Sequence, residues 1–276
     1  MTGSPPTSGV LDVPDGRLWF ETRGSGPDVL LIHPGLWDAR TWDPQMPVLV
    51  DAGYRVTRYD LRGYGRSSRL GDERFSNVRD LFAVLDAAGV ERTALVGCSM
   101  GGAIAIDAAL TEPDRTWALV PVAAGLGGFE STAEEDDWWA ERDAPIEAAI
   151  AAGDLERARE LQLEIWAPRG TDDPAGRAIR RIAFDNLHEL TMDESGAEEL
   201  EPPAARRLGE IAVPTLVIEA ELDPPDMRRI GQLIAAAVPD ARRVTIPGAD
   251  HVVNLREPAA FDAALLPFLD EFRPRG

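Results

Sequence analysis

The most informative gap in this 276-residue sequence is lysine, which does not occur at all. All 28 basic residues are therefore arginines, against 48 acidic residues, and the formal net charge is -20. Without lysine the chain has no Schiff-base nucleophile, no phosphate-binding P-loop lysine and no lysine general base. An acidic surface repels nucleic acid and anionic lipid. We therefore expect neither a nucleic-acid partner nor a membrane partner.

Cysteine, histidine and long apolar runs are also scarce. Cys98 is the single cysteine, which excludes an intrachain disulfide framework and favours a reducing compartment. The start, MTGSPPTSGV, lacks the basic and apolar parts of a secretory signal. Apolar runs are far shorter than the roughly 18 residues that a membrane span needs. We expect a cytoplasmic protein. Three scattered histidines and one cysteine make a poor metal site, and no G-x-G-x-x-G joins a strand to a helix, so we expect no cofactor.

The first half of the chain alternates short apolar runs with helical patterns. This alternation predicts an α/β domain whose sheet is mostly parallel and whose crossovers are helices. The expected strands are 17–22, 28–35, 54–60, 93–98 and 116–123, the first of them antiparallel at the edge. The expected helices between them are about 42–52, 76–89 and 99–111.

The alternation stops over residues 125–205, which are acidic, rich in alanine and helical in period. The clearest helices there are 153–166 and 175–190. Strands and helices then alternate again over 214–220, 225–238, 241–248 and 258–272. The domain organisation predicted is one core, 10–124 with 206–276, interrupted by a helical cap at 125–205. Residues 1–8 are expected to form a low-complexity tail.

The segment LVGCSMGG places two possible nucleophiles, Cys98 and Ser99, side by side. Residues 97–101 match G-x-S-x-G, in which a sharp strand-to-helix turn lifts the serine above the edge of the sheet. Flanking glycines let the neighbouring backbone approach closely. A β-branched strand precedes the segment and a small-residue helix follows it. We therefore expect Ser99 to be the nucleophile, with the Cys98 side chain turned away.

A serine nucleophile needs a base, and the chain has three histidines: His33, His188 and His251. When the serine follows a central strand, the order along the chain is serine, then acid, then histidine. Only His251 lies late enough, just after the last strand. His33 precedes the serine and is expected to shape an early loop. His188 lies within the helical cap.

The acid expected to orient His251 is Asp223, in the loop after strand 214–220. A carboxylate there can fix the imidazole tautomer and stabilise the imidazolium. Glu219 lies inside the strand, and an N-cap role is expected for Asp226. Asp250 is adjacent to His251, and neighbouring side chains diverge. The other carboxylate in this loop is Glu221.

The tetrahedral intermediate of such a reaction also needs an oxyanion hole. One donor is expected to be the backbone N–H of Met100, the residue after the nucleophile. The other is expected from the loop that follows strand 28–35, where the sequence HPGLW places Leu36. Backbone donors leave little mark on a sequence, so both assignments rest on position.

Four segments, taken together, resemble the α/β-hydrolase superfamily over residues 10–272. They are IHPG, DLRGYGRSS, GCSMGG and ELDPP with PGADHVVNLREP. The resemblance implies an eight-stranded, mostly parallel sheet with a helical cap, and a Ser99–Asp223–His251 triad. It is greatest to serine esterases and 3-oxoadipate enol-lactonase-like hydrolases. Pro34 separates His33 from Gly35, where members usually have His and Gly adjacent.

The cap is expected to lie over the triad as a lid with an apolar underside. Its aromatic residues, together with one in the early loop, are candidates to contact substrate; they are Trp37, Trp138, Trp139 and Trp166. The function predicted is hydrolysis of a small, mainly apolar carboxylic ester or lactone by a monomer or homodimer. The alternatives are a ligand receptor or signalling protein with slow turnover, and a C–C hydrolase or perhydrolase that uses the same triad.

Overall fold

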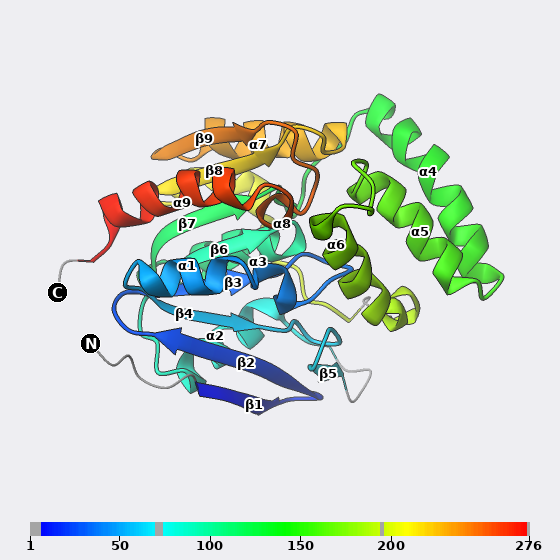
Figure 1. The fold of residues 1–276 in the computed structure, drawn as a ribbon. Helices are drawn as coiled ribbons and strands as arrows, with labels where there is room; N and C mark the ends of the chain where they lie inside the picture. The colour runs from blue at the N-terminus through cyan, green and yellow to red at the C-terminus, as the bar shows by residue number, and fades with distance from the viewer. Residues whose placement is uncertain (1–6, 70–73, 194–195, 275–276) are drawn as a thin grey trace.

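The computed structural model describes residues 7–69, 74–193 and 196–274. Within these ranges nine strands form one mixed sheet in the order β1-β2-β4-β3-β6-β7-β8-β9, and β5 pairs with β2 (Figure 1). The strands are β1 (Thr7–Val13), β2 (Gly16–Gly24), β3 (Asp28–Ile32), β4 (Arg55–Tyr59), β5 (Ser68–Arg69), β6 (Thr93–Cys98), β7 (Thr116–Val122), β8 (Thr215–Ala220) and β9 (Ala241–Ile246). The predicted mostly parallel sheet is confirmed, with the two-residue β5 as an extra ninth strand.

The N-terminal edge of the sheet is antiparallel. β1 pairs with β2, and β2 pairs with β4, whereas every later neighbouring pair is parallel. A tight turn at Asp15, whose φ is 51°, joins β1 to β2. The expectation that 17–22 forms the edge is wrong, because β1 lies outside it. Residues 7 and 8, predicted as tail, begin β1, and residues 1–6 lie outside the described residues.

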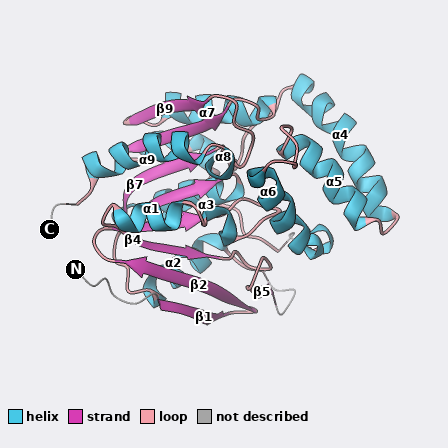
Figure 2. Cartoon of the chain, viewed as in Figure 1, coloured by secondary structure: helices cyan, strands magenta, loops and turns pink. Residues whose placement is uncertain are grey.

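Alternating side chains of the sheet supply two apolar layers. Leu30 and Ile32 face one layer, and Val29 and Leu31 face the other, as the two-residue period of a strand requires. The first layer is covered by α2 (Asn77–Ala87), α3 (Met100–Thr111) and α7 (Pro225–Ala237). The second is covered by α1 (Gln45–Asp51), α8 (Val253–Arg256) and α9 (Pro258–Phe272). Figure 2 shows the resulting three layers of helix, sheet and helix.

The chain between β7 and β8 forms the helical insert. It holds α4 (Ala133–Ala151), α5 (Leu155–Trp166) and α6 (Pro174–Asp185), followed by a 3-10 helix at Leu187–Thr191. No strand occurs in the described part of the insert, as predicted. All three helices lie beyond the carboxyl ends of the parallel strands (Figure 1). None of the described helices is both long and apolar enough to cross a membrane.

Candidate active site

A strained turn holds Ser99 between β6 and α3. Its backbone φ of 53° and ψ of -117° lie in a region that residues other than glycine rarely adopt. Such backbone strain is typical of functional sites. Glycines make the turn possible. A Cβ on Gly97 would collide with the Gly101 carbonyl group, and one on Gly102 would lie 2.5 Å from the Cβ of Ala124. The described turn therefore has the sharp strand-to-helix form that the G-x-S-x-G pattern predicts.

Close packing also brings the loop after β3 beside this turn. A Cβ on Gly101 would lie 2.6 Å from the His33 carbonyl oxygen, so the first turn of α3 lies directly against the end of β3. In the same loop Leu36 has a φ of 67°. Met100 is the first residue of α3, where backbone N–H groups have no helical acceptor, and Ser99 provides no side-chain cap. The two expected oxyanion donors thus lie on neighbouring segments.

His33 is fully buried and holds two loops together. Its Nε2 accepts a hydrogen bond of 2.8 Å from the Leu61 backbone N–H. This leaves Nδ1 to donate to the Pro34 carbonyl oxygen, also at 2.8 Å. Burial lowers the pKa of His33, which keeps the ring neutral. Both ring nitrogens are occupied, so His33 has the loop-shaping contacts expected from the sequence.

His251 pairs with Asp223. The imidazole Nδ1 lies 2.7 Å from Asp223 Oδ1, and both side chains are 2% exposed. Asp223 is held after β8 and His251 after β9, two neighbouring parallel strands whose carboxyl ends share one edge of the sheet. The Asp223 carboxylate accepts a hydrogen bond from the Nδ1–H group, so the other nitrogen, Nε2, is the one available to act as a base.

The competing carboxylates have other partners. Asp250 lies 2.8 Å from the Arg256 guanidinium, and Glu219 accepts a 2.8 Å hydrogen bond from the Thr245 hydroxyl. Glu221 accepts a 2.7 Å bond from the backbone N–H of Gly248. Burial raises the pKa of Asp226, which a hydrogen bond from Trp139 partly offsets. Of the five carboxylates considered in this region, Asp223 is the one bonded to His251.

The Cys98 side chain points away from the position of a nucleophile. It is fully buried, and its Sγ lies 3.7 Å from the His251 backbone oxygen, to which the thiol donates a weak hydrogen bond. Burial and the nearby charge of Asp223 raise the pKa of this thiol well above its ordinary value. The thiolate is the nucleophilic form of cysteine, and the raised pKa keeps the Cys98 thiol protonated, so Cys98 is a poor nucleophile. The thiol instead links the turn at Ser99 to the loop that carries His251, hereafter the histidine loop.

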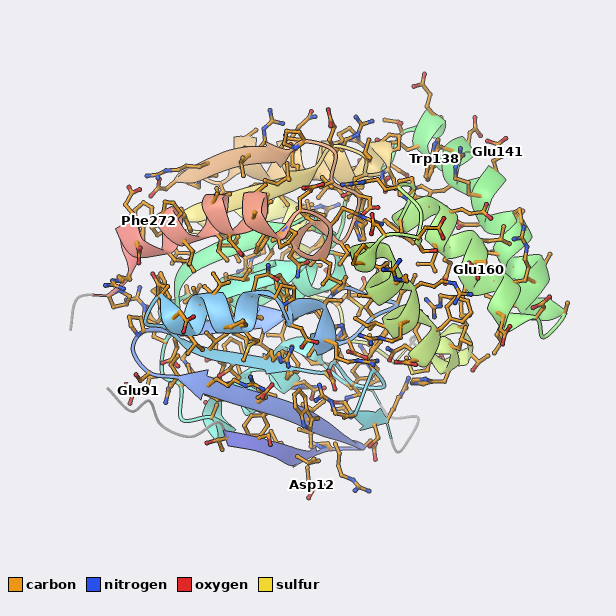
Figure 3. All side chains as sticks on the ribbon, viewed as in Figure 1. Asp12, Glu91, Trp138, Glu141, Glu160 and Phe272 are labelled. Atoms are coloured by element: carbon orange, nitrogen blue, oxygen red, sulfur yellow. The ribbon has the colours of Figure 1, made fainter. Side chains whose placement is uncertain are left out.

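Aromatic rings of the insert form a row that ends on His251. The ring centroids of Trp166 and His251 are 4.2 Å apart, those of Trp139 and Trp166 are 5.4 Å apart, and those of Trp138 and Trp139 are 4.9 Å apart. Trp37 lies separately, 6.5 Å from His251, and its indole N–H donates to the Ile179 carbonyl at 2.9 Å. Figure 3 shows Trp138 on α4, at the outer side of the insert.

His188 lies outside this group. It is exposed, and its Nε2 lies 2.7 Å from the Gly63 carbonyl oxygen. Sequence reasoning missed two buried polar residues that hold segments near the site in place. Asn186 and Arg256 each tie the insert to a loop of the core. Their types favour an exposed position, so only their distant partners reveal their role.

The described residues contain no group of three or more histidine, cysteine, aspartate or glutamate side chains arranged to hold a metal ion. One edge of the sheet carries a serine, an imidazole bonded to a carboxylate, and the backbone N–H groups that begin α3. Such a set can perform nucleophilic acyl transfer with its own groups.

Comparisons with known proteins cover most of the chain. A model of the alpha/beta hydrolase family matches residues 29–264. A Variovorax paradoxus protein with the provisional name carbamate hydrolase RutD is 31% identical over 268 residues, covering 91% of this chain and 96% of its own. Rhodomycin D methylesterase DauP from a Streptomyces species is 31% identical over 281 residues, covering 88% and 92%. The solved enol-lactonase of Burkholderia xenovorans shares the fold, with a TM-score of 0.73 at 21% identity over 95% of this chain and 100% of that one.

Proposed function

The chain belongs to the alpha/beta hydrolase family, and on that premise we propose that it is a serine hydrolase of small, mainly apolar carboxylic esters or lactones. The bond of 2.7 Å between His251 Nδ1 and Asp223 Oδ1 supports this most directly. It gives the imidazole a defined tautomer, and it does so on the sheet edge where the strained Ser99 also lies. Because the buried Cys98 thiol stays protonated, Ser99 is the nucleophile that remains in the turn.

In the proposed mechanism the Ser99 hydroxyl oxygen attacks the carbonyl carbon while His251 Nε2 takes its proton. The negative charge that develops on the carbonyl oxygen is held by the N–H groups of Leu36 and Met100. The alcohol then leaves with the proton from His251, and Ser99 carries the acyl group. His251 next deprotonates a water molecule, whose oxygen attacks the acyl carbon. The bond between the acyl carbon and the Ser99 oxygen then breaks, His251 returns the proton to that oxygen, and the acid is released.

The surroundings of the site favour an apolar substrate. Trp166 lies against the imidazole and Trp139 packs on Trp166, and helix α4 carries three acidic residues in its first turn. Negative charge on this helix disfavours a polyanionic substrate. The relatives named above include a methylesterase and a carbamate hydrolase, so a test panel needs simple esters, lactones, a methyl ester and a carbamate.

The decisive test is Ser99→Ala, assayed with p-nitrophenyl acetate and with this panel. We expect turnover to fall at least about a thousandfold, because the substitution removes the attacking oxygen. Cys98→Ala is the matched control at the adjacent position. It is expected to keep activity within about fivefold, since a weak S–H bond contributes less than about 1 kcal/mol.

A fluorophosphonate probe, which labels activated serines, separates this proposal from its rival. Labelling of the wild type but not of Ser99→Ala, with turnover on the panel, supports a hydrolase. Labelling with negligible turnover on every ester and lactone would favour a receptor on the same fold. Wild-type activity in Ser99→Ala would refute the proposed nucleophile.

A further inference from the structure

Trp166 touches His251 in two ways. Its indole ring lies 4.2 Å from the imidazole, centroid to centroid, with the planes at 42°. Its backbone oxygen also accepts a hydrogen bond of 3.3 Å from the His251 backbone N–H. Trp166 is the last residue of α5, so a residue of the helical insert is in direct contact with the proposed base of the core.

We propose that Trp166 is a positioning residue for His251, which its ring holds in the orientation that serves Ser99. The inference rests on the proposed function and assigns Trp166 a role other than substrate contact. The electron-rich face of an indole also attracts a cation within about 6 Å. It therefore favours the imidazolium that forms as Ser99 loses its proton.

The bond to Asp223 alone leaves the imidazole free to tilt. One hydrogen bond fixes the position of Nδ1 but permits rotation of the ring about that contact, which would swing Nε2 away from Ser99. Trp166 restricts that tilt by covering the ring from the side of the insert. Misplacement of a catalytic group by about 1 Å can cost about a hundredfold in rate. A packed aromatic neighbour is thus a source of catalytic precision.

Arg256 links the two segments that make this contact, the loop before His251 and the chain that follows α5. The Arg256 guanidinium lies 2.8 Å from Asp250, the residue before His251. It also donates at 3.0 Å to the Gly170 carbonyl and to Asp173, in the segment that follows α5. The Arg256 side chain is fully buried. One rigid group therefore fixes the histidine loop relative to the end of α5.

The row of tryptophans offers a matched pair of positions for a test. Trp166 contacts His251, whereas Trp138, at the far end of the row, stacks on Trp139 and lies 3.9 Å from the Arg142 guanidinium carbon. A small substrate such as p-nitrophenyl acetate reports on the chemistry with little demand on the insert. If Trp166 were only a substrate wall, its loss would raise KM and leave kcat intact.

The experiment compares Trp166→Leu, Trp166→Phe and Trp138→Leu by steady-state kinetics on this ester. We expect Trp166→Leu to lower kcat about tenfold or more, with KM within about twofold of wild type. Trp166→Phe restores a ring on the imidazole and is expected to recover kcat to within about threefold of wild type. Trp138→Leu is expected to lower kcat less than Trp166→Leu, because Trp139 and Trp166 separate Trp138 from His251 in the row. If Trp166→Leu does not fold, Trp166→Met, which keeps a bulky apolar side chain without a ring, takes its place in the comparison with Trp166→Phe and Trp138→Leu.

Several results would overturn the inference. They are a wild-type kcat in Trp166→Leu, a rise in KM alone, an equal loss in Trp138→Leu, and a Phe variant no better than the Leu variant. Where Trp166→Met replaces Trp166→Leu, a wild-type kcat in Trp166→Met, a rise in KM alone, or a Phe variant no better than the Met variant would do so. The proposed function fails separately, when the wild type neither turns over the ester nor takes up the fluorophosphonate at Ser99.

Discussion

Helices α6 and α4 of the insert are attached to the rest of the molecule by different kinds of contact. The α6 side is joined through hydrogen bonds of two fully buried side chains, Asn186 and Trp37. The Asn186 amide donates to Asp38 at 2.9 Å and accepts from the Gly65 N–H at 2.8 Å, and the Trp37 indole donates to α6. On the α4 side, Glu135 pairs with Arg229, whose side chain is 38% exposed.

The difference predicts that α6 is attached near the site by contacts that contribute more to stability than those of α4. A buried polar group that loses its partner costs about 1–3 kcal/mol, whereas an exposed ion pair contributes about 0–1 kcal/mol. Asp38 follows Leu36 and Trp37 in the loop after β3, so α6 braces the segment proposed to hold the oxyanion. Helix α4 also packs on α5 through a small apolar cluster that includes Ile146 and Ala158, and through Trp139 on Trp166.

The largest effect on stability is expected from Asn186→Ala. The substitution removes the fully buried Asn186 amide and so leaves one buried Asp38 oxygen and the Gly65 N–H without this partner. We expect the free energy of unfolding, measured in urea, to fall by about 2–4 kcal/mol, and kcat to fall with it.

Asp185→Ala is the control for that variant. Asp185 is adjacent in sequence, but its side chain is half exposed, and it pairs with Arg40 at 2.6 Å. Its loss is expected to cost at most about 1 kcal/mol. Equal losses in the two variants would erase the distinction between buried and exposed attachment on this side.

A smaller effect is expected from acid, through Asp38. Burial opposes ionisation of this carboxyl, but hydrogen bonds from Arg40 and Asn186 outweigh it and lower the pKa to about 2. Because the folded value lies below the ordinary value of 3.8, the stabilisation is fully present above about pH 4 and is lost as pH falls through about 2. The total is ~2 kcal/mol, of which about half is gone by pH 3.

This loss is measured by urea unfolding of wild type and Asp38→Asn at pH 5 and pH 3. The gap in unfolding free energy between them should narrow by about 1 kcal/mol at the lower pH. A gap that stays constant would show that Asp38 does not titrate in this range on unfolding.

The smallest effect is expected from Glu135→Gln. Glutamine keeps the shape of the capping box that Glu135 forms with Thr132 at the start of α4, and removes the charge that faces Arg229. We expect the melting temperature to fall by a few degrees at most, equivalent to less than about 1 kcal/mol. A loss of stability as large as that of Asn186→Ala would contradict the expectation that α4 is the more weakly attached helix.

Much of the fold could be predicted because local pattern and tertiary structure agree. Strand 93–98 and helix 258–272 have the predicted bounds, since one is a continuous apolar run and the other begins at a proline in a favoured first position. The predicted helix 175–190 instead ends at Asp185 and continues as a separate 3-10 helix, because Asn186 turns to bond Asp38 and Gly65.

The missed strand β1 has a physical explanation. Its side chains are largely exposed, so it lacks the apolar run that marks a buried strand. Its conformation depends on pairing with β2 across the turn at Asp15. The turn residues Pro14, Asp15 and Gly16 were the signal available in the sequence.

At the site, chain order was sufficient to choose Asp223 and His251 as a pair, because parallel strands bring their carboxyl ends to one edge. The fate of the tryptophans could not be predicted in the same way. Trp138 and Trp139 are adjacent in one helix, and which of them reaches Trp166 depends on the packing of α4 on α5. Arg256 is also beyond sequence reasoning, since its partner Asp173 lies 83 positions away.

The burial of Cys98 has a practical consequence. Its thiol is inaccessible and resists ionisation, so reagents directed at thiols should leave the folded wild-type protein unmodified. A cysteine introduced at Glu141, on the outer face of α4 (Figure 3), would then be the one reactive thiol of the folded chain. A spin label or dye attached there would report the movement of α4 in an otherwise native sequence, with no background cysteine to remove.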